Sequence, residues 1–408
     1  MLSAGYILVY FHRLSPAVLA VDMMRDLGAG GTLLGLLGAA YFYPYALMQM
    51  PAGLLSDSWG PRRSITLFLA IAVLGCVVLG TAPGAIWAIA GRALVGLGVS
   101  VFFVPTLKVL SEWFLPREFA VMTGLLLAVG ALGMLSATEP LALMNAWIGW
   151  RASFLAVGGM TLAAAVLVWL VVRDRPGDLD PETPAPPRNL DPGVRSGLLD
   201  GLRSVARHPR FWPIAIWFFC TGGTFFTFGG LWGGPYLVQV HELGSAQAGR
   251  TLSMLAVGAM LGAPLLSYLS DHVCRARKPV IVVVTLLFVA LTALLAFRPE
   301  RFSPLGMYLF CFGLGVSSNA VAVIGFAITK ELFPLEIAGT STGLVNLFPF
   351  AGAAVLQPLL GAILESHGRA AGGAFTLDGY RHAFLVLFLC ALAASASSFL
   401  MRETWTRS

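Results

Sequence analysis

The chain alternates long apolar stretches with short polar segments along almost its whole length. Roughly twelve such stretches can be recognised, and a helix of about 20 residues is long enough to cross about 30 Å of hydrocarbon. They cover approximately residues 2–23, 33–55, 64–82, 85–108, 119–143, 151–172, 211–239, 247–270, 279–297, 304–329, 338–363 and 380–401. The pattern predicts an all-α integral membrane protein with 12 transmembrane helices.

One polar segment is much longer than the others and divides the chain in two. Between residues 173 and 210 the composition changes to charged residues and prolines, followed by a short run that could lie on the membrane surface as a helix. Prolines and charges of this kind are typical of a linker. We therefore expect two pseudo-symmetric six-helix bundles, at 1–172 and 211–408, joined by a linker at 173–210.

The composition supports a membrane protein and sets its orientation. The chain is 57% hydrophobic and only 11% charged, with a mean hydropathy of +0.81, which is far more apolar than a soluble domain. Roughly 17 of the 26 Lys and Arg residues fall in loops on the same side as the amino terminus. The positive-inside rule therefore places both termini in the cytoplasm. We expect a multi-pass protein of the bacterial inner (cell) membrane, in contact with lipids and monomeric.

The sequence also disfavours several other classes of protein. The formal charge of +6 does not indicate a nucleic-acid partner, because Lys and Arg are not gathered into a stripe with stacking aromatic residues. The five cysteines are scattered and offer neither metal spacing nor a disulfide framework. We find no nucleophile and base pair and no glycine-rich phosphate loop after a strand. The sequence therefore predicts no enzyme, no cofactor and no metal site.

A short charged signature occurs twice, at matching places in the two halves. The first copy runs from residue 53 to 63, between the second and third stretches, and a degraded copy runs from 267 to 277. A carboxylate at the end of a helix can pair with nearby arginines or with a helix amino terminus. We expect a gating role for this motif, with its glycines allowing close helix approach and a tight turn. The residues of the gating motif are Gly53, Asp57, Gly60, Arg62, Arg63, Asp271 and Arg277.

The first copy resembles the Gly-x-Leu-x-Asp-x-x-Gly-x-Arg-Arg signature of the major facilitator superfamily. The segment from Arg92 to Gly98 is similar to the Arg-x-x-x-Gly-x-Gly pattern of its fourth helix. Within the superfamily, a mid-helix arginine in helix 1, the segment 113–116 and the segment 231–237 resemble the organic-anion and organophosphate carriers. The resemblance implies a carrier that works by alternating access, with a small organic anion bound between the halves.

Arg13 lies about ten residues into the first stretch, close to the bilayer centre. A charge at this depth costs about 2.5–3.5 kcal/mol on insertion scales, which implies a water-filled cavity, a carboxylate partner or an anionic ligand. We predict that Arg13 binds an anionic substrate. The alternative is a structural ion pair that locks helix 1. His12 points about 100° away around the helix, so both side chains cannot centre on one ligand.

A second pair of charges falls in helices 4 and 5. Arg92 and Glu139 lie at similar depths, so they could meet, and Glu139 is then a candidate proton-coupling residue whose protonation Arg92 would bias. The alternatives are a static buried pair, or a Glu139 that simply reaches the outer interface.

Polar and aromatic residues complete the predicted substrate site. Tyr41, Tyr45 and Gln49 share one face of helix 2, at positions i, i+4 and i+8. The carboxyl-terminal half shows no interior charge, and its candidates are the amides Asn319 and Asn346 and the aromatic residues Phe228 and Trp232. The alternative for all of these residues is ordinary helix packing.

These features favour a secondary active transporter of a small organic anion, coupled to protons or working by exchange. An efflux carrier for lipophilic drugs, siderophores or metal chelates is the alternative within transport. A receptor or scaffold that does not transport is the alternative outside it, because the fold alone does not determine the function.

Overall fold

The computed structural model describes residues 1–174, 198–333, 335–370 and 372–405, and these residues are almost entirely helical. The first half contains α1 (Leu2–Leu14), α2 (Pro16–Leu27), α3 (Gly31–Leu47), α4 (Pro51–Trp59), α5 (Pro61–Gly80), α6 (Ala85–Ser100), α7 (Phe103–Trp113), α8 (Pro116–Ser136) and α9 (Glu139–Val171). The rest contains α10 (Leu198–Arg207), α11 (Phe211–Thr227), η2 (Phe228–Trp232), α12 (Gly233–Gln239), α13 (Ser245–Tyr268), η3 (Leu269–Val273), α14 (Lys278–Phe297), η4 (Pro299–Arg301), α15 (Pro304–Ala320), η5 (Val321–Gly325), α16 (Phe326–Leu332), α17 (Leu335–Ser366) and α18 (Leu377–Leu400). Most of the expected linker lies outside the described residues.

The helices match the apolar stretches, although several are broken. Among the described residues, nine helices are long and apolar enough to cross a membrane, and the bent pairs α1 with α2 and α3 with α4 raise this number to 11. The remaining expected span, 119–143, begins in α8 and continues into α9. Gly149 has a φ of 77° inside α9, so the chain changes direction there. The structure is therefore that of a multi-span helical membrane protein.

Proline determines where the first two spans break. Pro16 begins α2 after a bend of 47°, and Pro51 begins α4 after a bend of 57°. Proline has no backbone N–H, so the carbonyl group four residues earlier loses its helical donor. In the first span this is the carbonyl of His12, next to Arg13. The bend therefore leaves an acceptor without its helical N–H donor at the depth of the predicted site.

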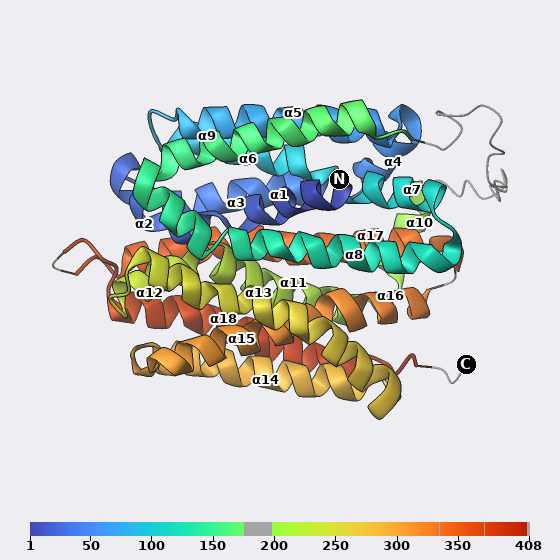
Figure 1. Ribbon diagram of the computed structural model, residues 1–408. Helices are drawn as coiled ribbons and strands as arrows, with labels where there is room; N and C mark the ends of the chain where they lie inside the picture. Colours follow the sequence, from blue (N-terminus) through green and yellow to red (C-terminus); the bar gives the residue numbers. More distant parts are fainter. Residues whose placement is uncertain (175–197, 334, 371, 406–408) are drawn as a thin grey trace.

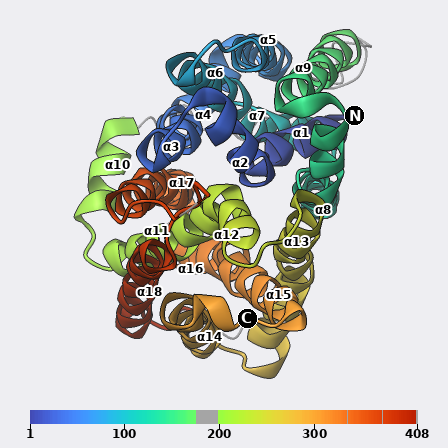
Figure 2. The same cartoon turned by 90° about the vertical axis from the view of Figure 1, so that its left-hand side faces the viewer.

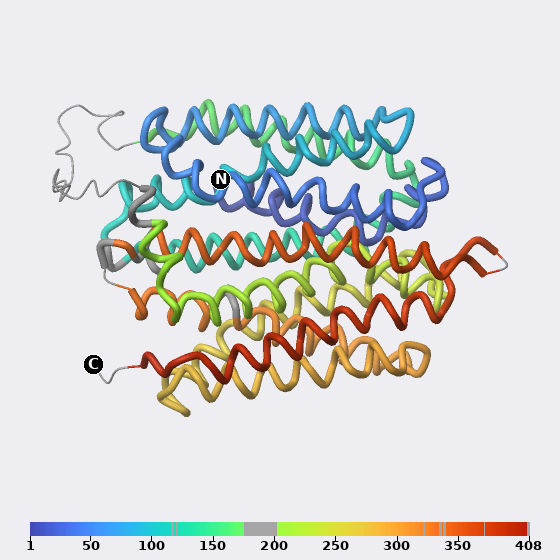
Figure 3. Tube along the Cα trace, turned by 180° about the vertical axis from the view of Figure 1, so that it is seen from behind, coloured from blue at the N-terminus to red at the C-terminus, as the bar shows by residue number. Residues whose placement is uncertain are grey.

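The two halves of the chain lie side by side. In Figure 1 the helices α1–α9 form the upper part of the molecule and α11–α18 form the lower part. Along the junction α3 packs on α17, and α13 packs on α8 and on the start of α9, as the end-on view of Figure 2 also shows. Seen from behind in Figure 3, the helices run the length of the molecule in both halves.

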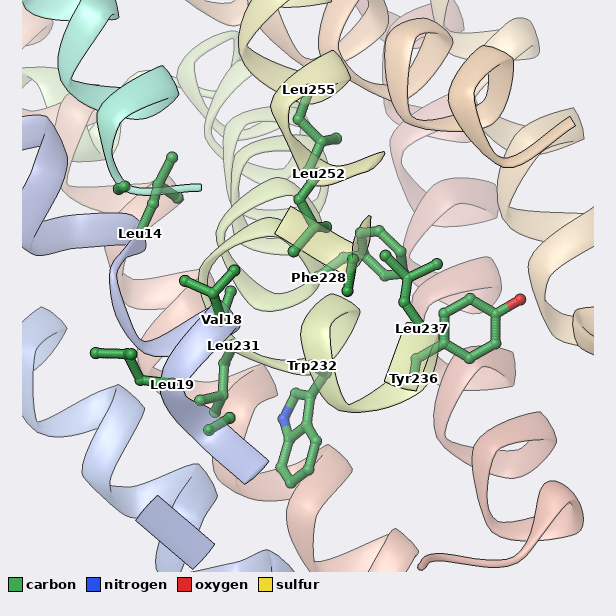
Figure 4. Packing of buried hydrophobic residues seen from close by; sticks show 14 of the residues in the cluster. Leu14, Val18, Leu19, Phe228, Leu231, Trp232, Tyr236, Leu237, Leu252 and Leu255 are labelled. Atoms are coloured by element: carbon green, nitrogen blue, oxygen red, sulfur yellow. The ribbon is translucent and has the colours of Figure 1, made fainter. Parts of the chain in front are cut away.

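The end of the molecule at which α9 finishes and α11 begins is called the linker end, and the opposite end, between α2 and α3, is called the far end. At the far end, glycines allow the backbones of the two halves to touch. A Cβ atom on Gly234 would overlap the carbonyl oxygen of Ala17, and one on Gly31 would press against the carbonyl oxygen of Gly361. Leu19 of α2 and Leu231 of η2 belong to the same cluster of buried hydrophobic residues, part of which Figure 4 shows. The halves are therefore in close contact at the far end.

The outer surface of the bundle is apolar. Large hydrophobic side chains are strongly exposed in the protein alone, for example Leu47 at 72%, Ile86 at 78% and Trp147 at 86%. Such a surface suits contact with hydrocarbon, because lipid tails are as apolar as the side chains that face them.

Candidate functional site

Arg13 lies at the junction of the two halves, inside a cage of four aromatic rings. Its side chain is only 4% exposed, and its Nη2 atom donates a hydrogen bond of 2.6 Å to the hydroxyl of Tyr45. The central carbon of the guanidinium lies 4.8–5.3 Å from the ring centres of Tyr10, Tyr45, Phe226 and Phe350. Tyr10 and Tyr45 come from the first half, whereas both phenylalanines come from the second. Arg13 therefore contacts both halves of the chain.

The charge of Arg13 has no acidic partner in the described part of the chain. No Asp or Glu oxygen among the described residues lies within 4.0 Å of the guanidinium of Arg13 or of Arg92. The Nε atom of Arg13 is buried and has no hydrogen-bond partner within the described ranges. A buried cation without a counter-ion is costly. The structural ion pair that the sequence left open is thus not formed, and the site suits an anion.

Arg92 binds the carbonyl group that Pro16 leaves without a helical donor. Its Nη1 atom donates a hydrogen bond of 2.9 Å to the carbonyl oxygen of His12, and its guanidinium lies over the ring of Tyr41 at 4.8 Å. Arg92 is fully buried, and its Nε and Nη2 atoms have no partner among the described residues. Arg92 thus adds a second buried positive charge close to Arg13. Its hydrogen bond to His12 also fixes the end of α1, the helix that carries Arg13.

His12 points away from Arg13, as the helical geometry predicted. Its Nε2 atom lies 3.1 Å from the hydroxyl of Thr161 and 4.0 Å from the sulfur of Cys76. These partners belong to α9 and α5, within the first half. His12 therefore belongs to the interior of that half and not to the cage around Arg13.

The polar face predicted for the second span, in α3 and the turn after it, borders the cage. The rings of Tyr41 and Tyr45 stack, with centres 5.6 Å apart and planes at 15°. One turn further on, the Oε1 atom of Gln49 accepts a hydrogen bond of 2.8 Å from the Nδ2 atom of Asn346. This bond joins the two halves on the linker side of Arg13. Asn346 and the three polar residues of the second span therefore do come together.

The other predicted residues of the carboxyl-terminal half lie elsewhere. Trp232 donates a hydrogen bond of 2.9 Å to the carbonyl of Gln357, and Phe228 packs edge-on against Phe310. Both aromatic side chains are fully buried among apolar neighbours, as Figure 4 shows. Asn319 donates a hydrogen bond of 2.6 Å to the carbonyl of Ala259 within its own half. In this conformation these three residues pack against protein groups away from Arg13.

Sequence reasoning found Tyr45 but missed the other three rings around Arg13, namely Tyr10, Phe226 and Phe350. Phe350 lies four residues after Asn346, so a helical face drawn through that amide would have included it. Phe226 lies only two positions before Phe228, the aromatic residue that the sequence suggested in this part of the chain. The rotation of α11 about its own axis determines which of these rings faces the junction. No local sequence pattern predicts that rotation.

The expected pairing of Glu139 with Arg92 is wrong for this structure. Glu139 accepts hydrogen bonds from Arg250 of α13, at 3.0 Å from Nε and 2.5 Å from Nη2. Glu139 follows the break at the end of α8, and Gly249 lets α13 approach the backbone there. The side chain therefore turns towards the other half, where it forms an ion pair at the junction.

The gating motif forms contacts within the first half. Asp57 pairs with Lys108 at 2.6 Å and not with the arginines that the sequence suggested, because α7 brings Lys108 to the end of α4. Arg62 lies over the ring of Trp169 and donates a hydrogen bond of 2.8 Å to its carbonyl. Arg63 is exposed. The motif thus connects α4 to α7 and α5 to α9 at the linker end of one half.

The glycines of the motif and its second copy complete this arrangement. Gly60 has a φ of 84° and forms the predicted tight turn, whereas a Cβ atom on Gly53 would meet nothing within 4 Å, so the expected close approach is not made. In the second copy Arg277 pairs with Asp271, and its Nη2 atom lies 3.2 Å from Glu331. Both copies therefore act inside their own halves in this conformation.

At the far end several polar contacts cross between the halves. Besides the pair of Glu139 and Arg250, the backbone N–H of Thr32 donates a hydrogen bond of 2.9 Å to Glu365. Arg369 reaches the carbonyl of Ala29 at 3.4 Å. At the linker end, the ion pairs between described residues stay within one half each. The structure therefore represents a conformation that is closed at the far end.

Comparison with known proteins connects this geometry to a family. A sequence model of the Major Facilitator Superfamily matches residues 2–356 and again residues 235–405. A probable sulfoacetate transporter of Cupriavidus necator is 24% identical over 391 residues, which cover 89% of this chain and 86% of that protein. The D-galactonate transporter of Escherichia coli is 22% identical, covering 91% and 89%. The hexuronate transporter of Escherichia coli is 23% identical, covering 90% and 87%.

Solved structures share the fold. A bacterial homologue of the human lysosomal transporter Spinster, in an inward-facing and unoccupied conformation, superposes with a TM-score of 0.78 at 19% identity, covering 98% of this chain and 95% of that one. The nucleoside transporter NupG superposes with a TM-score of 0.75 at 14% identity, covering 98% and 100%. With its duplicated gating motif and its buried site between two helical halves, this chain belongs to the Major Facilitator Superfamily of membrane transporters.

Proposed function

We propose that this transporter carries a small organic anion, and that Arg13 binds the anionic group of the substrate. The observation that carries this proposal is the buried guanidinium of Arg13, which lies between rings of both halves with no carboxylate partner among the described residues. An anion placed there would neutralise a costly charge and would contact both halves at once. The relatives described above, which are named for sulfoacetate, D-galactonate and hexuronates, support the same class of substrate.

We also propose an orientation and a location. The excess of Lys and Arg near the linker end favours a cytoplasmic linker end in a bacterial inner membrane. The far end then faces outward, and the structure is the conformation closed to the outside. We propose the divisions at 1–172, 173–210 and 211–408 as the two moving bundles and their linker.

The positions of the acidic residues help to distinguish proton-coupled transport from exchange. Proton symport needs a group that takes up a proton close to the substrate site, and in the described part of the chain no carboxylate pairs with Arg13 or Arg92. His12 is fully buried, and a proton on it would add a third positive charge beside Arg92. We therefore propose exchange of one anion for another, in which the carrier reorients with an anion bound.

Uptake into proteoliposomes tests the function and its driving force together. A labelled organic acid should enter vesicles that are preloaded with the same unlabelled acid, whereas an imposed proton gradient across empty vesicles should drive no accumulation. Accumulation driven by the proton gradient alone would disprove exchange. If only lipophilic cations or metal chelates crossed the membrane, the alternative of an efflux carrier would be correct. If no solute crossed it, the protein would be a scaffold.

The ion pair of Glu139 and Arg250 should favour the conformation closed at the far end. Glu139→Gln is expected to open this end more often, by at most about fivefold, because exposed pairs contribute little. Arg250 is 60% exposed, so salt should weaken the effect further. Labelling of a cysteine introduced at the buried Leu19, by a reagent that does not cross the membrane, measures this equilibrium. The exchanged pair Glu139→Arg with Arg250→Glu should restore normal labelling.

A proton-coupling role for Glu139 predicts a different result. In that case Glu139→Gln would abolish accumulation of substrate against a gradient, and the exchanged pair would not restore it.

A further inference from the structure

The carboxyl-terminal half presents aromatic rings to Arg13. Phe226 of α11 and Phe350 of α17 lie 5.3 and 4.9 Å from the guanidinium, and their rings stack with centres 5.5 Å apart at 21°. The helices that carry them are in close contact, because Gly223 and Gly352 let the two backbones approach. The pair of rings is therefore a firmly supported wall that faces the predicted anion site.

Three basic residues of that half form ion pairs near the ends of its helices, and the described contacts of Arg13 include no basic side chain of that half. Among the described residues, Arg250 pairs with Glu139 at the junction, Arg277 pairs with Asp271 and Arg381 pairs with Glu300. A second acidic group on a ligand would consequently meet phenyl faces. Such faces carry partial negative charge and offer no hydrogen-bond donor, so an anion is poorly solvated against them.

Arg92 does not offer a second contact either. It is fully buried, it lies over the ring of Tyr41, and its Nη1 atom already binds the carbonyl of His12. Tyr41 is itself fully buried and separates Arg92 from the cage. The charge of Arg92 therefore raises the local positive potential and strengthens the binding of one anionic group at Arg13, without touching the ligand.

We infer that Phe226 and Phe350 are specificity-determining residues that select anions with a single charged group and a body whose C–H or aromatic face packs on the two rings. This inference rests on the proposed role of Arg13 as the anion-binding group. The amides of Gln49 and Asn346, which border the cage, provide donors and acceptors for hydroxyl groups of such a body. By this inference a hexonate with one carboxylate should be preferred over a hexarate of equal length, whose second carboxylate would face the rings.

Binding measurements with matched anions test the inference. The purified full-length protein is titrated with gluconate and with glucarate, and with benzoate and phthalate as a second pair, by thermal shift and by calorimetry. We expect the anion with one charge to bind at least about tenfold more tightly than its partner with two charges, in one pair or both. Phe350→Leu and Phe226→Leu should each reduce this ratio about threefold to tenfold, because each removes one ring from the wall.

Two further variants complete the test. Phe42 packs on both rings, at 5.6 and 6.4 Å, but is not part of the cage, so Phe42→Leu should leave the ratio unchanged. Phe350→Tyr keeps the ring but adds a hydroxyl donor, so it should fold and should weaken the preference, which tests the inference even if Phe350→Leu does not fold. Equal or tighter binding of the anions with two charges would overturn the inference, as would the same loss of preference in the Phe42 variant.

The outcomes also separate this inference from the proposed function. If anions bind and Arg13→Gln abolishes their binding, but the preference for one charge is missing, only the inference fails. If no anion of the panel binds, or if binding survives in Arg13→Gln, the proposed function fails and the inference fails with it.

Discussion

Replacing Arg13 with glutamine is expected to reduce binding and uptake of the anionic substrate about 100-fold or more. Losing one partner of a buried, charged hydrogen-bonded pair costs about 2–5 kcal/mol, and every 1.4 kcal/mol is a factor of ten in affinity. The reason is specific to this site, because Arg13 contacts both halves and no other described side chain brings a positive charge into the cage. Calorimetry and uptake into proteoliposomes measure the effect.

The stability of the same variant separates a binding role from a structural one. Glutamine removes a buried charge that has no carboxylate partner among the described residues, so the apparent melting temperature without substrate should be equal to or above that of the wild type. If Arg13 instead stabilised the fold, the variant should have a lower apparent melting temperature than the wild type. Arg298→Gln, at an exposed arginine, is the matched control and should transport normally. Full transport of anions by Arg13→Gln would exclude the proposed function.

Replacing Gly234 with valine is expected to reduce transport about 10- to 100-fold. A Cβ atom at this position overlaps the carbonyl oxygen of Ala17 in the other half, and forcing extra atoms into a packed contact costs about 1–3 kcal/mol. The clash exists only while the far end is closed, so the variant should remain in the opposite conformation. A carrier that cannot close one end cannot complete its cycle.

Labelling and a second glycine make this prediction specific. In a Cys274→Ser background, a cysteine at Leu19 should react with an impermeant reagent faster in Gly234→Val than in the parent protein. Gly159 is the matched control, because a Cβ atom there meets nothing within 4 Å, and Gly159→Val should behave like the parent. Normal transport by Gly234→Val would show that the observed contact at the far end is not required.

The apolar stretches and the repeated loop were sufficient to predict the fold and the family. Length and hydropathy identify spanning helices before any packing is known, because every span must be long and apolar enough to cross the hydrocarbon core of the bilayer. The motif around Asp57 predicted a gating role, and the depth of Arg13 predicted a binding site, because a charge at the middle of a span is costly. These signals are local, so each can be recognised in a single stretch of sequence.

Contacts between helices could not be predicted in the same way. The sequence suggested that Glu139 meets Arg92, that Asp57 meets arginines and that Trp232 lines the site, whereas the structure pairs Glu139 with Arg250 and Asp57 with Lys108. A hydropathy pattern defines the depth of a residue to within about a turn, but it leaves the rotation of each helix and its neighbours undetermined.

The sequence by itself determined that this protein is a two-part membrane carrier with a buried positive charge in its first half. Only the tertiary structure decided what surrounds that charge, because the cage of Arg13 joins Tyr10 and Tyr45 to Phe226 and Phe350, which lie more than 180 residues further along the chain. The physical reason is that the identity of a neighbour across a helix junction depends on packing angles and small residues such as Gly234, which act over the whole bundle.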